Sequence, residues 1–155
     1  MIPRILVQAD DFDVNAELAI LRAASSRIGG MVTFLGVVRD VNEAAAVSTL
    51  YLEHYPGMTE KQIATIVGEA CERWALLGAT VIHRIGELAP TDQIVFVGVA
   101  AEHRGEAFDA CEYIIDFLKT RATFWKKEQT PAGDRWLETR ASDETATQRW
   151  QHRQD

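Results

Sequence analysis

Two lysines in the segment DFLKTRATFWKKE, Lys119 and Lys126, occupy positions where an amine could take part in catalysis. An apolar stripe precedes them at helical steps of three and four residues, formed by Phe108, Cys111, Ile115 and Leu118. Lys119 lies four residues beyond Ile115, so we expect its amine beside buried surface. A lysine that only extends its ammonium group into water at a helix end, where the helix dipole favours a cation, would fit the same position.

The residues after Lys119 are predicted to bring a second amine towards it. Residues 124–129 alternate in the manner of a strand, with Lys126 on the same face as Phe124 and Glu128. Two amines near a low-dielectric wall repel each other and lose hydration, so at least one of them should lose its proton more easily. In this way a lysine becomes chemically useful at pH 7.

Further cations stand at the predicted ends of other elements. Arg39 and Arg140 each end a predicted strand. His103 and Arg104 lie at the start of the helix that carries Lys119, where free backbone N–H groups and the positive end of the helix dipole favour an anion. We therefore expect a cradle for a small anion such as a phosphate. Each arginine could equally be a surface ion-pair partner, because the chain has 23 acidic residues.

The other reactive side chains indicate no metal site and no nucleophilic cysteine, and they give no positive signal for a nucleophilic serine. The four histidines show no i, i+4 pairing and no neighbouring cysteine cluster: His54, His83, His103 and His152. Cys71 and Cys111 lie on apolar helical stripes and are interpreted as buried structural thiols. His54 and His83 fall within predicted strands, which favours a structural role for both. The sequence contains no G-x-S-x-G motif.

The elements that must position these residues form an α+β pattern. Strands are predicted at 4–8, 31–40, 47–55, 79–88, 94–101, 124–129 and 135–140, and helices after Asp13 or Asn15, at 60–74, after His103 and, briefly, after Ser142. Strands 31–40 and 47–55 are expected to pair with each other antiparallel across a short loop. Strands 124–129 and 135–140 are expected to form the last hairpin.

Length and composition favour a single domain that spans residues 1–155, with a hydrophobic content of 47%. The net charge of -7 argues against a general nucleic-acid binder, because phosphate tracking requires a basic surface. No apolar run approaches the ~20 residues of a membrane-spanning helix, and the N-terminal segment lacks the pattern of a signal peptide. We therefore expect a cytoplasmic protein.

Several motifs in a specific order resemble the large, catalytic subunit of molybdopterin synthase. The resemblance runs from about Gly30 to Trp150 and includes TFLGVVRD, LEHYPGMTEK, VIHRIGEL, DQIVFVGVAAEHR, DFLKTRATFWKKE and GDRWLETR. It implies an enzyme of molybdenum-cofactor biosynthesis, a sulfurtransferase that converts cyclic pyranopterin monophosphate into molybdopterin by inserting two sulfurs as a dithiolene. It also implies an α/β hammerhead fold with an additional antiparallel β subdomain.

The resemblance further implies partners and site residues, with no cofactor and no metal. A small ubiquitin-like subunit carries the sulfur as a C-terminal thiocarboxylate, and two large subunits form a homodimer within a heterotetramer. Lys119 and Lys126 match the family's catalytic lysines, and Arg140 matches an arginine that can come from the neighbouring subunit. The implied substrate-binding residues are Val37, Val38, Arg39, His103, Arg104, Lys119, Lys126, Lys127, Glu128 and Arg140.

The chemistry of the implied reaction suggests a role for each lysine. We hypothesise that Lys119 polarises the thiocarboxylate carbonyl or stabilises the tetrahedral species formed on its release. Lys126 would transfer protons at the pterin side chain, where water or hydroxide leaves. Two other functions fit the lysines: a Schiff-base enzyme, which borohydride trapping would reveal, and a scaffold subunit, which would bind substrate and partner without forming product.

Three residues differ from the family's usual pattern. Thr123 stands where a proline is common, Asp40 where an asparagine is common, and Glu102 where a small residue is usual. The two carboxylates could pair with Arg39 or Arg104 and weaken anion binding. Thr123 would leave the approach of Lys126 to Lys119 less rigid, because it lacks the fixed φ of proline.

Overall fold

The computed structural model describes residues 1–42, 45–137 and 141–151. The helices are α1 (Val14–Arg22), α2 (Met58–Arg73), α3 (Arg104–Leu118) and α4 (Ala141–Gln148). The strands are β1 (Arg4–Gln8), β2 (Gly30–Val37), β3 (Val41–Asn42), β4 (Ala45–Ala46), β5 (Thr49–His54), β6 (Leu76–Arg84), β7 (Gly86–Leu88), β8 (Gln93–Ala101), β9 (Phe124–Thr130) and β10 (Gly133–Leu137). This mixture of helices with largely antiparallel strands confirms the predicted α+β class.

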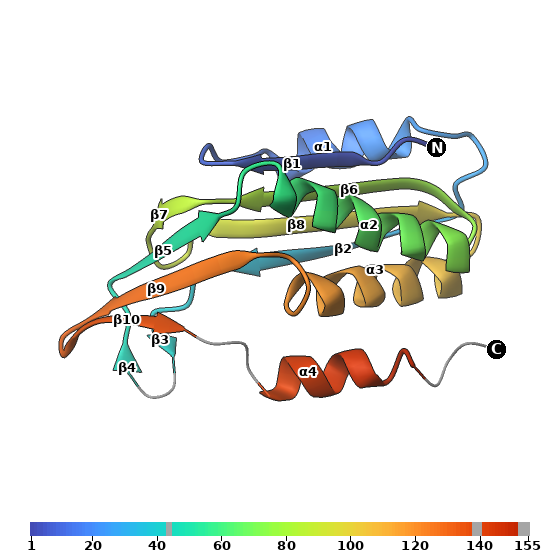
Figure 1. Cartoon of the computed structure of the whole chain (residues 1–155). Coiled ribbons are helices and arrows are strands. Elements are labelled where there is room, and N and C mark those ends of the chain that lie inside the picture. Colours follow the sequence, from blue (N-terminus) through green and yellow to red (C-terminus); the bar gives the residue numbers. More distant parts are fainter. Residues whose placement is uncertain (43–44, 138–140, 152–155) are drawn as a thin grey trace.

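The first sheet has the order β1-β6-β8-β2 and is covered by helices on both faces. Only β1 and β6 run parallel, and the other neighbours are antiparallel. In Figure 1, α2 and α3 lie across one face of this sheet, and α1 lies on the other. The two central strands, β6 and β8, are almost continuously buried, as strands covered on both faces should be.

The main core lies between α2, α3 and the first sheet. Its fully buried members include Ile63, Ile66 and Val67 from α2, Val81 from β6, Val97 and Val99 from β8, and Ala107, Ala110 and Ile114 from α3. Burial of this apolar surface is the main force that fixes α3 against the sheet. Within the described ranges, no helix combines the length and the apolar character needed to cross a bilayer.

The second sheet has the order β10-β9-β5-β7, with antiparallel pairing throughout. It lies at one end of the first sheet, beyond the end of α3 (Figure 1). β9 is paired on both edges, because Lys126 lies opposite Leu52 of β5 and also opposite Leu137 of β10. The predicted hairpin of 124–129 with the following strand is therefore confirmed, with Gly133 at a positive φ of 110° after the turn.

The predicted pairing of strands 31–40 and 47–55 is wrong. β2 pairs with β8, and β5 instead lies between β9 and β7 in the second sheet. β3 and β4, which pair with each other, occupy the connection between β2 and β5. Two strands that are adjacent in sequence and similar in length often pair, but here the long apolar strand β8 offers β2 a more extensive partner.

The predicted apolar stripe on α3 is wrong at one position, because Phe108 is 59% exposed. The buried face instead passes through Ala107, Cys111, Ile114 and Leu118, at steps of three and four residues. Phe108 lies one residue beyond Ala107, which corresponds to a rotation of about 100° away from this face. The stripe at Cys111 and Leu118 is confirmed.

The last helix, α4, returns to pack beside α3, and the predicted helix after Ser142 is confirmed. Trp150 is 1% exposed and meets the rings of Trp74 and Tyr113 edge-on. Its indole N–H donates to Asp116 Oδ2 at 2.7 Å. Trp150 is therefore an aromatic anchor with a satisfied polar atom. Ion pairs of Arg149 with Glu112 and Asp116 add to the attachment to α3.

The two faces of α3 should differ sharply in their contribution to stability. Truncation of the fully buried Ile114 to alanine should lower the free energy of unfolding by about 2–5 kcal/mol, because it removes apolar contact and leaves a cavity. Phe108→Ala, on the exposed face of the same helix, should cost less than about 1 kcal/mol. Urea denaturation measures both values, and equal losses would contradict the assignment of the buried face.

Candidate functional site

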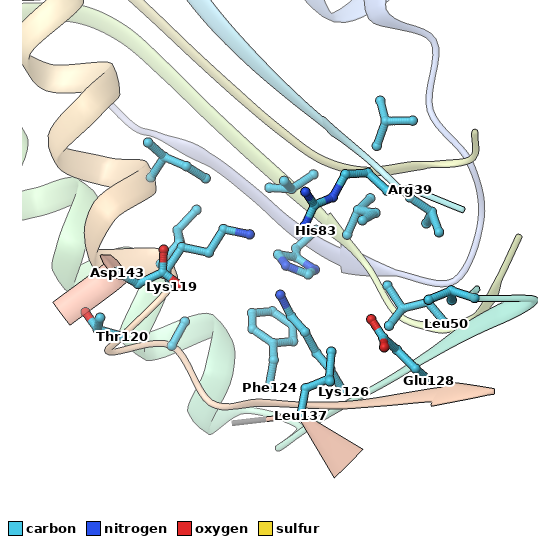
Figure 2. A pocket seen from close by; sticks show the side chains of 18 residues that line it. Arg39, Leu50, His83, Lys119, Thr120, Phe124, Lys126, Glu128, Leu137 and Asp143 are labelled. Carbon is cyan, nitrogen blue, oxygen red and sulfur yellow. The ribbon is translucent and has the colours of Figure 1, made fainter. Parts of the chain in front are cut away.

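A cavity of about 330 Å³ lies where the C-terminal end of α3 meets β9 and the ends of β2, β6 and β8. Its volume is in the range of small-molecule sites. The lining includes Val37, Val38, Arg39, Val47, Leu50, His83, Ile94, Val95, Ile115, Leu118, Lys119, Thr120, Ala122, Phe124, Lys126, Glu128, Leu137 and Asp143. The lining thus combines apolar residues with charged groups that project from several elements into one space (Figure 2).

Arg39, Lys119 and Lys126 bring three cationic side chains to this cavity. Figure 2 shows all three directed towards the same central space. Lys119 is the C-cap of α3, and its backbone N–H donates to the Ile115 carbonyl at 3.3 Å. The C-terminal end of a helix carries a partial negative charge, so this position favours an ammonium group. The arrangement is suited to a small anion, because several donors converge on one volume.

The alternation of β9 separates two sets of side chains, as the sequence predicted. Phe124, Lys126 and Glu128 line the cavity. Lys127 belongs to the opposite face of the strand, where its Nζ lies 5.3 Å from the ring centroid of Tyr51 and 5.5 Å from that of Trp136. Contacts of this kind are cation–π interactions. In this chain Lys127 therefore stabilises the outer face of the second sheet and does not line the cavity.

The Glu128 carboxylate is held by an arginine of the neighbouring strand. Glu128 is 4% exposed, and its Oε2 accepts hydrogen bonds from Arg135 Nε at 3.1 Å and Nη2 at 2.9 Å. The two residues lie opposite each other in the β9–β10 register. A buried carboxylate requires such a partner, and this pairing limits how much negative charge Glu128 presents to the cavity.

His103 and Arg104 lie far from the cavity of the same chain. His103 is the N-cap of α3, Arg104 is its first residue, and both are exposed. Lys119 caps the other end, and 16 residue steps along a helix correspond to about 24 Å. No single small molecule bound beside Lys119 could reach His103 of the same chain. The predicted site residue Arg140 lies outside the described residues.

The connection between α3 and β9 is fixed by two residues of α2. The Thr59 hydroxyl accepts from the Tyr55 N–H at 2.9 Å and donates to the Thr123 carbonyl at 2.8 Å. Gln62 Oε1 accepts from the Thr123 N–H at 2.7 Å. Proline has no N–H and could not make this last bond. The Gln62 contact thus fixes a position where the loss of proline was expected to leave the chain less rigid.

The carboxylate of Glu102 has a partner other than the one that the sequence suggested. Its Oε2 accepts from Arg27 Nη2 at 2.8 Å, in an exposed ion pair. The expectation that Glu102 pairs with Arg104 is therefore not met in this structure. An exposed ion pair of this kind contributes little to stability, so its main consequence is that Arg104 keeps its positive charge uncompensated by Glu102.

His83 is a cavity residue that the sequence did not identify. It was predicted to be structural, and the structure places it in the cavity wall on β6, 5% exposed. Its ring stacks on Phe124 with 3.8 Å between centroids and 18° between planes. Burial lowers the pKa of His83 to about 3, and the nearby positive charges of Lys126, Lys119 and His54 act in the same direction. The sequence feature that could have identified this site residue is a histidine inside the apolar run of a buried strand.

The two cysteines remain structural in the fold. Burial raises the pKa of the Cys111 thiol to about 12, and it also raises that of Cys71. Neither thiol lines the cavity. Among the described residues, no group of three histidine, cysteine, aspartate or glutamate side chains could hold a metal ion.

Comparison with known proteins assigns the family. The model of the MoaE protein family matches residues 7–121. The chain belongs to the MoaE family. The molybdopterin synthase catalytic subunit of Ralstonia nicotianae is 57% identical over 148 residues, which are 96% of this chain and 84% of the relative. That of Escherichia coli is 55% identical over 147 residues, which are 95% of this chain and 97% of the relative.

Solved structures of family members have the same fold. The molybdopterin biosynthesis MoaE protein from Burkholderia ambifaria superposes with a TM-score of 0.84 at 49% identity, over 97% of this chain and 99% of that one. Molybdopterin synthase from Staphylococcus aureus gives a TM-score of 0.79 at 29% identity, over 85% of this chain and 95% of that one. The resemblance read from the sequence is confirmed at the level of family.

The low pKa of His83 should make stability depend on pH. Between pH 6.5 and about 3 the unfolded chain binds a proton at this histidine that the folded chain does not. The free energy of unfolding should therefore decrease as the pH falls through this window, by up to about 1.4 kcal/mol per pH unit from this group. Urea denaturation between about pH 7 and about pH 5 should show a smaller decrease for His83→Gln than for the wild type. Equal decreases would exclude a neutral buried His83.

Proposed function

We propose that the chain is the catalytic subunit of molybdopterin synthase, a sulfurtransferase of molybdenum-cofactor biosynthesis. The observation that carries this proposal is the convergence of Arg39, Lys119 and Lys126 on one cavity, in a chain 57% identical to a protein of that name. Its substrate would be cyclic pyranopterin monophosphate. The phosphate of this substrate carries negative charge, and cationic donors in a partly apolar cavity are suited to bind it.

The sulfur would come from a small ubiquitin-like partner subunit with a C-terminal thiocarboxylate. A solved complex of subunits 1 and 2 of the molybdopterin-converting factor from Helicobacter pylori shares this fold, with a TM-score of 0.70 at 17% identity. In the present chain, the partner's C-terminal tail would enter the cavity beside Lys119. An extended tail that ends in a charged group is a suitable ligand for a small cavity lined by cations.

The reaction would replace two oxygens of the pterin side chain with sulfur. At each step the thiocarboxylate sulfur bonds to a side-chain carbon and an oxygen leaves that carbon, in one step as water and in the other as a phosphate oxygen when the cyclic phosphate opens. Water then attacks the resulting thioester carbonyl. The partner's tail departs as a carboxylate and the sulfur stays on the pterin. Lys119 would stabilise the oxyanion of the tetrahedral species, and Lys126 would donate a proton to the leaving oxygen.

A complete site would require a second large subunit, which we propose as a homodimer within a heterotetramer. Because His103 and Arg104 lie at the far end of α3, they could reach a pterin phosphate only in the cavity of a partner chain. The edge strand β2 exposes Phe34, Leu35 and Val37, by 38%, 40% and 43% respectively. Val37 also lines the cavity, so an apolar surface adjoins the site where a second chain would be needed.

Two finer features of the architecture belong to the same proposal. We assign the first sheet with its helices to an α/β hammerhead, and the β10-β9-β5-β7 sheet to the additional antiparallel subdomain. We also treat residues 1–155 as one domain. The support is that both sheets contribute walls to one cavity, through β6 and β8 on one side and β9 on the other.

Loss of either lysine should reduce turnover without loss of the fold. Lys119→Ala should lower kcat by about 100–1000-fold, because one donor to the oxyanion is removed. Lys126→Ala should lower kcat by at least about 100-fold through the loss of proton transfer. Dithiolene formation from cyclic pyranopterin monophosphate and the thiocarboxylated partner measures both rates. Lys61→Ala, at an exposed position of α2, is the control.

Three results would count against this proposal. A wild-type chain that binds substrate and partner but forms no product would favour a scaffold. A stable adduct at Lys119 after borohydride treatment with a small carbonyl compound would favour Schiff-base chemistry. A Lys126→Ala rate close to that of the wild type would remove its role in proton transfer.

If each active site is formed by residues of two large subunits, two variants that are inactive alone should restore activity when they are combined. Co-expression of Lys119→Ala with His103→Ala chains should give mixed dimers in which one of the two sites retains both residues. With random assembly, half of the dimers are mixed, so the preparation should recover about a quarter of the wild-type activity. Each variant alone should be nearly inactive. Activity no higher than that of the separate variants would place His103 outside a shared site.

A further inference from the structure

The two ring nitrogens of His83 have different environments. Nδ1 lies 2.8 Å from the carbonyl oxygen of Arg84. A carbonyl oxygen only accepts hydrogen bonds, so Nδ1 must carry the proton. In a neutral imidazole the other nitrogen, Nε2, then has a free lone pair and is an acceptor. Among the described residues, the structure records a hydrogen bond of this side chain only at Nδ1.

The surroundings keep this imidazole neutral. The ring is 5% exposed and stacks on Phe124, so protonation would place a charge on a buried side chain. Lys126, Lys119 and His54 contribute positive charge or partial positive charge around it, which further disfavours a cation. Figure 2 shows the His83 ring between Arg39, Lys119 and Lys126, in the centre of the labelled residues. A neutral acceptor therefore lies beside Arg39, Lys119 and Lys126, which can only donate hydrogen bonds while they are charged.

The other polar groups of the cavity indicate what Nε2 of His83 could contribute, namely acceptance of a hydrogen bond from a ligand N–H. Arginine and charged lysine offer no acceptor. Of the two carboxylates that line the cavity, Glu128 is engaged by Arg135 and Asp143 is a charged acceptor on α4. The Thr120 hydroxyl, at the end of α3, is a further polar lining group. A ligand that carries an anionic group at one end and N–H donors at the other would find donors for the anion but would need an acceptor for the N–H. Nε2 of His83 meets that requirement without adding a charge.

We infer that His83 is a substrate-binding residue whose Nε2 accepts a hydrogen bond from a ring or amino N–H of the pterin. This inference rests on the proposed function, because it names the heterocycle of that substrate. His83 orients the ring system, while Arg39 and the two lysines bind the anionic end. No proton is transferred to His83 in this role. A histidine with only a structural role would need the stack on Phe124 and the Nδ1 bond, but not an accessible lone pair on Nε2.

The tautomer can be tested without any assumption about turnover. Histidine-selective ¹⁵N labelling and NMR of the wild-type chain should show His83 protonated at Nδ1 and unprotonated at Nε2 throughout the neutral pH range. Addition of cyclic pyranopterin monophosphate should shift the Nε2 resonance, because the lone pair enters a hydrogen bond. A proton on Nε2 in the free protein, or an Nε2 resonance unchanged at saturation, would overturn the inference.

Variants separate recognition from packing. His83→Phe keeps an aromatic ring against Phe124 and removes both nitrogens, so substrate affinity should fall about tenfold, the effect of one lost hydrogen bond. His83→Gln, whose amide oxygen is also an acceptor, should retain more affinity than His83→Phe. Lys61→Ala, at an exposed position of α2 that does not line the cavity, should bind substrate like the wild type. Calorimetric titration with cyclic pyranopterin monophosphate, in the absence of the sulfur-carrier subunit, gives these affinities.

Steady-state kinetics distinguish failure of the inference about His83 from failure of the proposed function. With the thiocarboxylated partner present, His83→Phe should raise KM about tenfold and change kcat much less, because the lost contact orients the ring and takes no part in proton transfer. Unchanged affinity and KM in a folded His83→Phe chain would overturn the inference while leaving the proposed function intact. If His83→Phe fails to fold, His83→Gln and the wild-type NMR result decide. Absence of dithiolene product from the wild type would instead overturn the proposed function.

Discussion

The short connection between α3 and β9 is the constraint on which the site depends. It must place Lys119, at the end of a helix, and Lys126, inside a strand, around one cavity despite the repulsion between their ammonium groups. The hydrogen bonds from Thr59 and to Gln62 hold its last residue, Thr123, at both backbone polar groups. Pairing of β9 on both edges then fixes the direction of Lys126. The placement of two like charges around one cavity is thus supported by contacts to the backbone that do not depend on the lysines themselves.

The electrostatics of the cavity follow from the charged groups that line it and from the partners of those groups. Arg135 neutralises Glu128, and the C-terminal end of α3 supports the charge of Lys119. Burial keeps His83 neutral in the same space. The lining holds three cationic residues (Arg39, Lys119 and Lys126) and two carboxylates (Glu128 and Asp143), of which Glu128 is paired with Arg135. The lining is therefore cationic, although the whole chain carries a net charge of -7. Local placement of a few groups, and not overall composition, determines which ligand such a cavity favours.

Local patterns in the sequence predicted the features that depend on one element, and missed those that depend on several. Period-two alternation placed Lys126 on the cavity face of β9, because that period is a property of one strand. The pairing of β2 with β8 could not be derived in this way, since the choice of strand partner depends on contacts distant in sequence. His83 was missed for the same reason: its position in β6 indicates burial, but only the arrival of Phe124 and the two lysines makes it part of a site.

The two ends of α3 have opposite polarity, which gives the helix two chemically distinct roles. Its N-terminal end carries His103 and Arg104 beside free backbone N–H groups and favours an anion, whereas its C-terminal end favours the ammonium of Lys119. A single chain cannot use both ends on one small ligand, because they are about 24 Å apart. In the proposed dimer, two-fold symmetry resolves this separation: each α3 would supply Lys119 to its own cavity and an anion-binding end to its partner's. Dimerisation would then complete the chemistry of the site as well as bury apolar surface.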